Sequence, residues 1–159
     1  MRNRLRDRRM MGLAVAQAYL GMRKNRGGPF GAVIARNGRV IARGHNRVVG
    51  TNDPTAHAEV VAIRRASARL KKFDLSDCEI YSTCEPCPMC LAAIAWANIG
   101  TVFFGCTRED AEKIGFRDKA FYDLLGRKAS KALKRIRLGR RECLGPFREW
   151  EQKKDRIPY

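Results

Sequence analysis

The spacing of apolar and polar residues divides most of the chain into helical and strand segments. A helical pattern covers residues 8–24, and a Gly-Gly-Pro breaker follows at 27–29. Two apolar runs, 30–35 and 40–45, flank an Arg-Asn-Gly-Arg sequence at 36–39. Because Asn-Gly readily adopts the positive φ angles of a tight turn, the pattern predicts an antiparallel hairpin.

Strands and helices alternate through the rest of the chain. In order, we expect a loop at 46–54, a helix at 57–70 capped by Thr55, a turn at 74–77, a strand at 78–83, a helix at 87–98, a strand at 101–105 and helices at 109–113 and 118–134. Strand–helix–strand order after a hairpin is typical of an α/β fold with a partly parallel, helix-covered sheet.

The length of 159 residues suits one domain, and the charge balance is unusual for its size. The chain has 33 Lys and Arg against 16 Asp and Glu, a net charge of +17. Residues 1–9 carry a net charge of +4 and residues 126–159 carry +8, so both ends are basic. This excess fits either a solvated, self-repelling surface or attraction to polyanions such as nucleic acid. No aromatic-and-basic motif of a known RNA-binding module accompanies it.

The start of the chain superficially resembles a secretory signal, because several arginines precede an apolar stretch. Gln17 and Tyr19 interrupt that stretch, and an amphipathic helix explains it better. The apolar run 91–97 has seven residues, whereas a membrane-spanning helix needs about 20. We therefore expect a cytoplasmic protein that does not enter the membrane.

Six cysteines are present, and four of them fall within the thirteen residues 78–90. Without an export signal, such a cluster indicates metal binding or catalysis rather than disulfides. Cys87 and Cys90 are three residues apart, so one helical turn places both sulfurs on one side. Together with His57 they offer three ligands of the types that zinc prefers. A structural zinc site normally has four protein ligands, so three would leave a position open to water, whose pKa zinc lowers toward neutrality.

Glu59 lies two residues after His57, where it approaches such a water without joining the ligands. That placement suits a proton shuttle between water and substrate. Cys84 is near enough to close the site as a fourth ligand, but we expect it to be a small buried residue. Cys78, Cys106 and Cys143 are expected to be packing residues. A Cys-x-x-Cys pair alone also occurs in structural zinc sites and redox pairs.

The combination of His57-Ala58-Glu59 with Pro86-Cys87-Pro88-Met89-Cys90 matches the signature of zinc deaminases, H-x-E followed by P-C-x-x-C. The chain resembles the cytidine deaminase-like superfamily over nearly its whole length. The resemblance implies a three-layer αβα sandwich with a mixed sheet of about five strands. It also implies a single zinc-dependent deaminase domain over 1–159, with one zinc ion per subunit and Cys84 outside the ligand set.

Further segments resemble bacterial guanine deaminases more closely than other branches. They are residues 28–33 with Asn46, residues 52–59 with 84–90, and residues 114–118 with Pro146, Phe147, Trp150 and Tyr159. The tRNA adenosine deaminases share the zinc core but tend to carry a Gly-Ala-Ala-Gly-Ser-like stretch near 114–118, which is absent here. Guanine deaminases commonly have two acidic residues after Gly-Phe, and this chain has Arg117 at the first of them.

The resemblance also implies roles for the substrate site. Phe30 would stack on the base, Asn46 would hydrogen-bond the edge of its ring, and Ala58 would also contact it. Asp118 would be a second catalytic carboxylate beside Glu59, and Tyr159 would close the pocket, in family members through a C-terminal segment exchanged between the subunits of a homodimer. Three plainer interpretations stay open: Phe30 as strand core, Asn46 as a loop cap and Asp118 as a helix cap.

The resulting hypothesis is hydrolytic deamination of a purine base, with guanine converted to xanthine and ammonia by attack of water at C2. The first alternative is another deaminase substrate, either a guanosine-type nucleoside or the wobble adenosine of tRNA. The second is a catalytically silent zinc domain that binds RNA. Glu59 disfavours the silent domain, because a structural zinc site has no use for an acid beside an open position.

Overall fold

The computed structural model describes residues 4–118, 121–122 and 134–156. Its elements are α1 (Arg4–Arg23), β1 (Gly31–Arg36), β2 (Arg39–His45), α2 (Val48–Thr51), α3 (Ala58–Leu70), β3 (Glu79–Cys84), α4 (Pro88–Trp96), β4 (Thr101–Cys106), α5 (Arg108–Lys113), β5 (Lys134–Arg137) and α7 (Arg140–Gln152). No helix within these ranges combines the length and the apolar character needed to cross a membrane.

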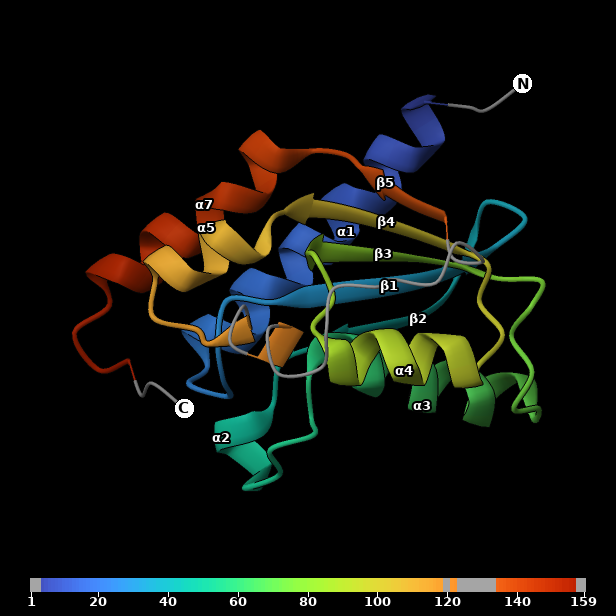
Figure 1. Cartoon of the computed structure of the whole chain (residues 1–159), viewed down its shortest axis with the longest axis horizontal. Helices are drawn as coiled ribbons and strands as arrows, with labels where there is room; N and C mark the ends of the chain where they lie inside the picture. Colours follow the sequence, from blue (N-terminus) through green and yellow to red (C-terminus); the bar gives the residue numbers. More distant parts are fainter. Residues whose placement is uncertain (1–3, 119–120, 123–133, 157–159) are drawn as a thin grey trace.

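The five strands form one mixed sheet in the order β2-β1-β3-β4-β5 (Figure 1). The expected hairpin pairs β1 with β2, and β1 is also antiparallel to β3. From β3 onward the pairing is parallel, because α4 carries the chain back from the end of β3 to the start of β4. The mixed sheet and the opening hairpin confirm the predicted fold class.

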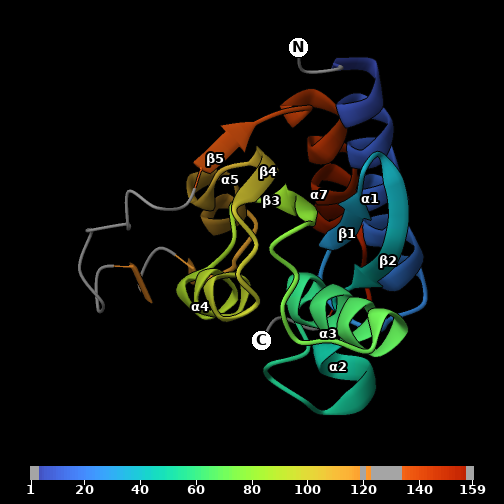
Figure 2. The ribbon, with the colours of Figure 1, turned by 90° about the vertical axis from the view of Figure 1, so that its right-hand side faces the viewer.

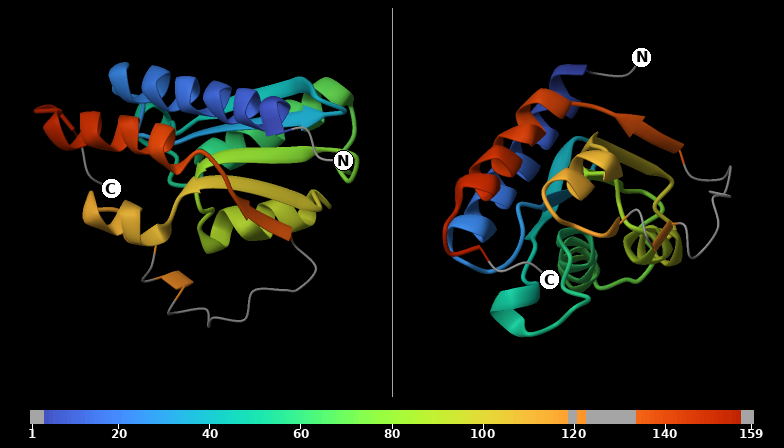
Figure 3. Two further views of the ribbon diagram at one scale, coloured as in Figure 1. Left: turned by 90° about the horizontal axis from the view of Figure 1, so that it is seen from above. Right: turned by 60° about the vertical axis from the view of Figure 1, so that its left-hand side comes forward.

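Helices cover both faces of this sheet (Figures 2 and 3). On one face α1, α5 and α7 bury a cluster that includes Met11, Phe103 and Phe147. On the other face α3 and α4 bury a second, mostly aliphatic cluster that includes Ile80 and Ile94. Successive residues of a strand point to opposite faces, so β3 contributes side chains to both clusters. The helices α1 and α7 pack together on the first face, where Arg23 of α1 and Glu149 of α7 form an ion pair.

Several predicted boundaries differ from the structure. The short helix α2 lies inside the predicted loop 46–54. His57, rather than Thr55, is the N-cap of α3, because Thr55 instead donates both its backbone N–H and its hydroxyl to Asp53. The helix predicted at 118–134 lies largely outside the described residues, and residue 134 begins the unpredicted strand β5.

Candidate active site

Two helix starts meet at the carboxyl end of β3 and supply the three predicted metal ligands. His57 is the N-cap of α3, and Cys87 is the N-cap of α4. Both have extended backbone angles, and Pro88 occupies the first turn of α4, where a missing N–H costs nothing. Cys90 follows one turn into α4 and is fully buried. The positive ends of two helix dipoles therefore face the cluster and favour thiolate ligands.

The donor atoms of these residues lie close together. The Nδ1 atom of His57 is 3.7 Å from the sulfur of Cys87 and 3.6 Å from that of Cys90. All three donor atoms lie within 4.8 Å of one another. A hydrogen bond from Cys90 lowers the pKa of Cys87 to about 4, although burial opposes the shift. Buried imidazole and thiolate donors in this arrangement fit zinc, and as a set of three they leave a fourth position open.

Cys84 is not part of this cluster, as the sequence predicted. Its thiol donates to the carbonyl of Thr107 at 3.5 Å, and burial raises its pKa well above the usual value. Within the described ranges, the group of side chains able to hold a metal ion consists of His57, Cys87 and Cys90.

Glu59 lies in the first turn of α3, directly beside the ligand cluster. Only 6% of it is exposed, and burial raises its pKa. The Ser82 hydroxyl donates to Oε1 of Glu59 at 2.7 Å. The second oxygen, Oε2, lies 3.4 Å from the sulfur of Cys90 and thus faces the ligands. A carboxyl group held here is within reach of whatever binds at the open position.

The cluster forms one wall of a cavity of about 210 Å³. Its lining residues are Phe30, Asn46, Val48, Pro54, His57, Glu59, Cys84, Glu85, Cys87, Phe116, Arg117, Asp118 and Phe121. The volume is below the ~300–1,000 Å³ typical of sites for drug-sized ligands, and it suits a compact flat molecule. A single nucleobase is of that kind.

Two of the expected base-binding residues line this cavity and also have a structural contact. Phe30 meets Phe116 edge to face with ring centroids 4.7 Å apart, and it meets Phe147 of the core at 5.4 Å. Asn46 is buried, and its Oδ1 accepts a hydrogen bond from the backbone N–H of Val48 at 3.1 Å, at the start of α2. Phe30 therefore packs against the core, and Asn46 caps the loop, while both residues also line the cavity.

The other proposed substrate residues differ in where the structure places them. Asp118 lies on the cavity wall, where burial and the nearby Cys87 raise its pKa to about 7. No hydrogen bond from another described residue holds its carboxyl group. Ala58 is fully buried in the cluster under α3 and is not among the cavity-lining residues. Tyr159 lies outside the described residues.

The structure also reveals contacts that the sequence analysis missed. The Tyr122 hydroxyl donates to the carbonyl of Pro86, just before Cys87. The Arg108 guanidinium lies 4.3 Å above the Tyr122 ring, and the backbone N–H of Arg108 donates to Glu85 at 3.4 Å. These contacts hold Tyr122 against residues 85–86, which directly precede Cys87. Residues on separate elements carry them, so no local spacing in the sequence reveals them.

A mixed sheet that presents a His/Cys/Cys cluster and a buried glutamate at two helix starts is the architecture of zinc-dependent deaminases. The chain belongs to the cytidine and deoxycytidylate deaminase family, whose zinc-binding region matches residues 5–106.

Within this family, the chain is similar to the guanine deaminase of Bacillus subtilis. The two are 45% identical over 138 residues, which cover 86% of this chain and 88% of the relative. The solved structure of that enzyme aligns with a TM-score of 0.73 and 41% identity, covering 96% of this chain and 98% of the other. A solved guanine deaminase from Nitrosomonas europaea aligns with a TM-score of 0.79 and 28% identity, covering 91% and 84%.

A tRNA-specific adenosine deaminase of Buchnera aphidicola is also similar to this chain. The two are 36% identical over 119 residues, which cover 75% of this chain and 78% of the relative.

Proposed function

We propose that this protein is a zinc-dependent guanine deaminase, built as one domain over residues 1–159. It would convert guanine and water to xanthine and ammonia. The observation that carries the proposal is a buried, unligated glutamate beside three soft metal ligands, at the wall of an aromatic-lined cavity of base size. The similarity to the Bacillus enzyme over most of both chains supports guanine as the substrate.

His57, Cys87 and Cys90 would hold one zinc ion per subunit. The metal supplies Lewis acidity, which lowers the pKa of water from 15.7 to about 7 and makes it a nucleophile at neutral pH. Thiolate ligands require reduced sulfur, so we place the enzyme in the cytoplasm.

The protein's own side chains bind the base and move protons. Phe30 offers a ring face to the flat base, and Asn46 lies where its amide reaches the ring edge. Glu59 takes one proton from the attacking water and delivers it to the ring nitrogen beside C2, and it then moves the second proton of that water to the departing amine. Asp118 accepts hydrogen bonds from the C2 amino group. A C2–O bond forms, the C2–N bond breaks, and ammonia leaves.

Ammonia release from a panel of bases, nucleosides and tRNA tests the proposal. Zinc-loaded protein should release ammonia from guanine fastest, and its product should be xanthine. Glu59→Gln should keep zinc but lose turnover, which shows that the ammonia does not come from a contaminating enzyme. Unchanged guanine alongside deamination of a nucleoside or tRNA would contradict the proposed substrate. Bound zinc with no ammonia from any substrate would indicate a silent domain.

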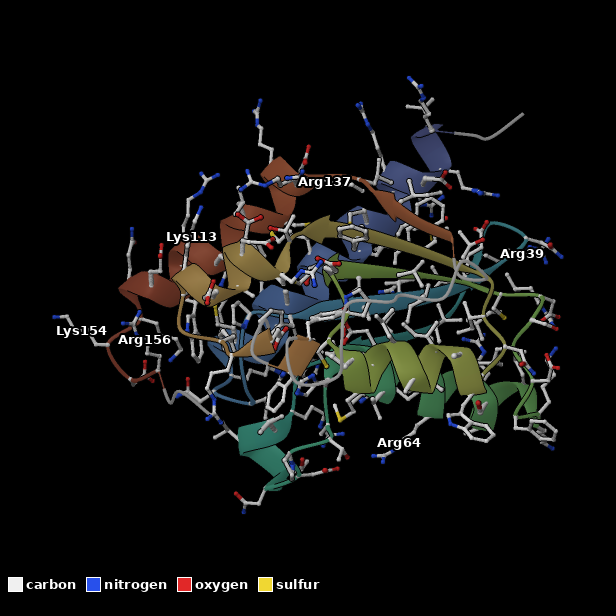
Figure 4. The ribbon with its side chains drawn as sticks, viewed as in Figure 1. Arg39, Arg64, Lys113, Arg137, Lys154 and Arg156 are labelled. Carbon is white, nitrogen blue, oxygen red and sulfur yellow. The ribbon has the colours of Figure 1, made fainter. Side chains whose placement is uncertain are left out.

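Deamination of tRNA is a second candidate because the net charge is +17 and tRNA deaminases are among the relatives. Basic residues such as Arg137, Lys154 and Arg156 are exposed, and the side chain of Lys154 extends outward from the surface (Figure 4). A gel shift with tRNA at increasing salt distinguishes this candidate. Tight binding that weakens steeply with salt, together with deamination of tRNA adenosine, would favour it.

We further propose that the enzyme is a homodimer and that α4 contributes to the interface. The sequence of α4 has no charged residue, although one side of it is exposed. Trp96 at its end is 85% exposed, and Phe73, in the segment between α3 and β3, is 82% exposed. Exposed apolar groups of this size are typical of association surfaces. Trp96→Lys should shift the protein toward monomer in light scattering coupled to size exclusion, whereas an unchanged mass would contradict this interface.

A further inference from the structure

Ser82 of β3 has no role in the function described so far, yet it contacts the side chain on which that function depends. Its side chain is directed to the face of the sheet covered by α3, and only 1% of the residue is exposed. Its hydroxyl lies 2.7 Å from Oε1 of Glu59, a short and well-formed hydrogen bond. Both groups are buried, so water does not compete for this contact.

The hydrogen bond distinguishes the two oxygens of Glu59. Oε1 is held by Ser82 on the sheet side, and Oε2 is thereby directed toward Cys90 and the metal-ligand cluster. No arginine or lysine within the described ranges hydrogen-bonds to this carboxyl group. The neutral hydroxyl thus fixes its orientation without adding an opposing charge. Proton transfer depends steeply on such orientation, because a displacement of about 1 Å can reduce a rate by about 100-fold.

We propose that Ser82 is a positioning residue that sets the orientation of Glu59 for proton transfer. This inference rests on the proposed deaminase function. It requires the loss of the Ser82 hydroxyl to act on the chemical step, through Glu59, rather than on metal binding or on binding of the base.

The adjacent residue on the same strand provides a matched control. Tyr81 is directed to the opposite face of the sheet, where its hydroxyl lies 2.9 Å from Oδ1 of the buried Asp7 and 3.0 Å from Oε2 of Glu79. Tyr81→Phe removes the same kind of contact from the same strand, but at a distance from the cavity. It separates the general cost of losing a buried hydroxyl–carboxylate hydrogen bond from an effect on the reaction.

The experiment compares Ser82→Ala, Ser82→Thr and Ser82→Val with Tyr81→Phe in the zinc-loaded enzyme. We expect Ser82→Ala to reduce kcat for guanine by about 10- to 100-fold, with KM changed by less than about threefold. Ser82→Thr retains a hydroxyl and should keep most of kcat. Ser82→Val, which has the shape of threonine without the hydroxyl, should not. Tyr81→Phe should lower Tm and leave kcat unchanged. If threonine and valine are too large for the site, the comparison of kcat between Ser82→Ala and Tyr81→Phe tests the proposal.

Two further measurements do not depend on turnover. The zinc content of Ser82→Ala, measured by elemental analysis, should equal that of the wild type. Adding Ser82→Ala to the inactive Glu59→Gln variant should leave its Kd for guanine unchanged in calorimetry. A lost metal or a weakened Kd would overturn the positioning role, because Ser82 would then act on the site's assembly or on binding.

Retention of kcat in Ser82→Ala, in an active wild-type background, would overturn the inference and leave the proposed function intact. Wild-type enzyme that deaminates no base would overturn the proposed function, and the role of Ser82 with it. The two failures are therefore distinguishable.

Discussion

The two faces of β3 each carry a hydroxyl that donates to a buried carboxyl group, and they use it differently. On the face covered by α1, Tyr81 donates to Asp7, which also accepts two hydrogen bonds from Arg6 at 3.0 and 2.9 Å. On the face covered by α3, Ser82 donates to Glu59. There, no arginine or lysine of the described chain shares the contact, and burial raises the pKa of Glu59.

The difference indicates what each carboxyl group is for. A buried carboxylate with a cation and a hydroxyl beside it is stabilised, and Asp7 thereby fastens α1 to the sheet. A buried carboxyl group without such a cation has a raised pKa, which suits it to take up and release a proton. The carboxyl group on one face of the sheet therefore supports the fold, and the one on the other face belongs to the groups that we propose react.

The largest expected contrast concerns cysteines on the two faces. Cys87→Ala should lose zinc and with it essentially all turnover, because two ligands hold the metal far less well than three. Cys143 is fully buried in the cluster under α7, and Cys143→Ala should keep zinc and cost only about 1 kcal/mol of unfolding free energy for its small cavity. Elemental analysis and thermal unfolding measure the two effects.

Cys84→Ala sharpens this test, because Cys84 lines the same cavity as Cys87. Its thiol donates to a backbone carbonyl and lies outside the ligand cluster, so the variant should retain zinc. Equal metal loss in Cys84→Ala and Cys87→Ala would place Cys84 among the ligands.

The next contrast concerns the two carboxyl groups themselves. Glu59→Gln should reduce kcat by about 10²–10⁴-fold, the usual contribution of a general acid–base group, with zinc retained. Asp7→Asn should leave kcat unchanged and lower the free energy of unfolding by about 1–3 kcal/mol, because Arg6 and Tyr81 lose a charged partner. Steady-state kinetics give kcat and denaturant titrations give the free energy of unfolding of both variants. Near-normal turnover in Glu59→Gln would refute the proton shuttle.

A smaller effect is expected where the two faces meet at the aromatic wall of the cavity. A Cβ atom at position 28 would lie 2.6 Å from the Phe116 ring and 2.9 Å from the Phe30 ring, closer than such contacts occur. Gly28→Ala should therefore displace both rings and raise KM for guanine by about 10-fold, the scale of one aromatic contact. Gly12→Ala is the control, because its Cβ would meet nothing within 4 Å. Equal KM values in the two variants would argue against a base-stacking wall.

The smallest expected effect is on the pH dependence of the unfolding free energy, and it concerns Asp110 on the face of the sheet covered by α1, α5 and α7. Burial opposes ionisation of Asp110, but hydrogen bonds from Arg140 and Thr107 outweigh it and lower the pKa of Asp110 below its ordinary 3.8. Its stabilising contribution is then complete above that value and is lost as the pH falls through the folded pKa. Between about pH 6 and pH 3, Asp110→Asn should lose less unfolding free energy than wild type, by about 1 kcal/mol. Parallel urea titrations measure the difference.

The hairpin, the alternation of strands and helices and the grouping of His57, Cys87 and Cys90 could all be predicted from the sequence. They depend on local signals: Asn37-Gly38 for the turn, Pro88 for the start of α4, and short fixed spacings for the ligands. The helix α7 was missed because Pro146 lies inside it, and proline normally interrupts a helix. Pro146 and Phe147 are both buried, and the packing of Phe147 in the core favours the helix in spite of that cost.

The surroundings of the site were less predictable. Ser82 is an ordinary strand residue until β3 is placed beside α3, and Tyr122 gains its contact only when its segment packs against Pro86. These contacts join elements far apart in the chain, so the local spacing of residues in the sequence does not predict them. The proposed role of Asp118 came from family resemblance, and its position on the cavity wall came from tertiary packing.

The placement of the chain's two tryptophans gives the protein a pair of built-in optical reporters. Trp150 is 4% exposed, and its ring centroid lies 5.8 Å from that of the cavity-lining Phe116. Trp96 on α4 is 85% exposed. An indole in water emits at longer wavelength than one in an apolar core, so the two contribute separable bands. Titration with guanine should alter the short-wavelength band, and dilution should alter the long-wavelength one. Unlabelled protein would therefore report ligand entry and the proposed subunit association in one spectrum.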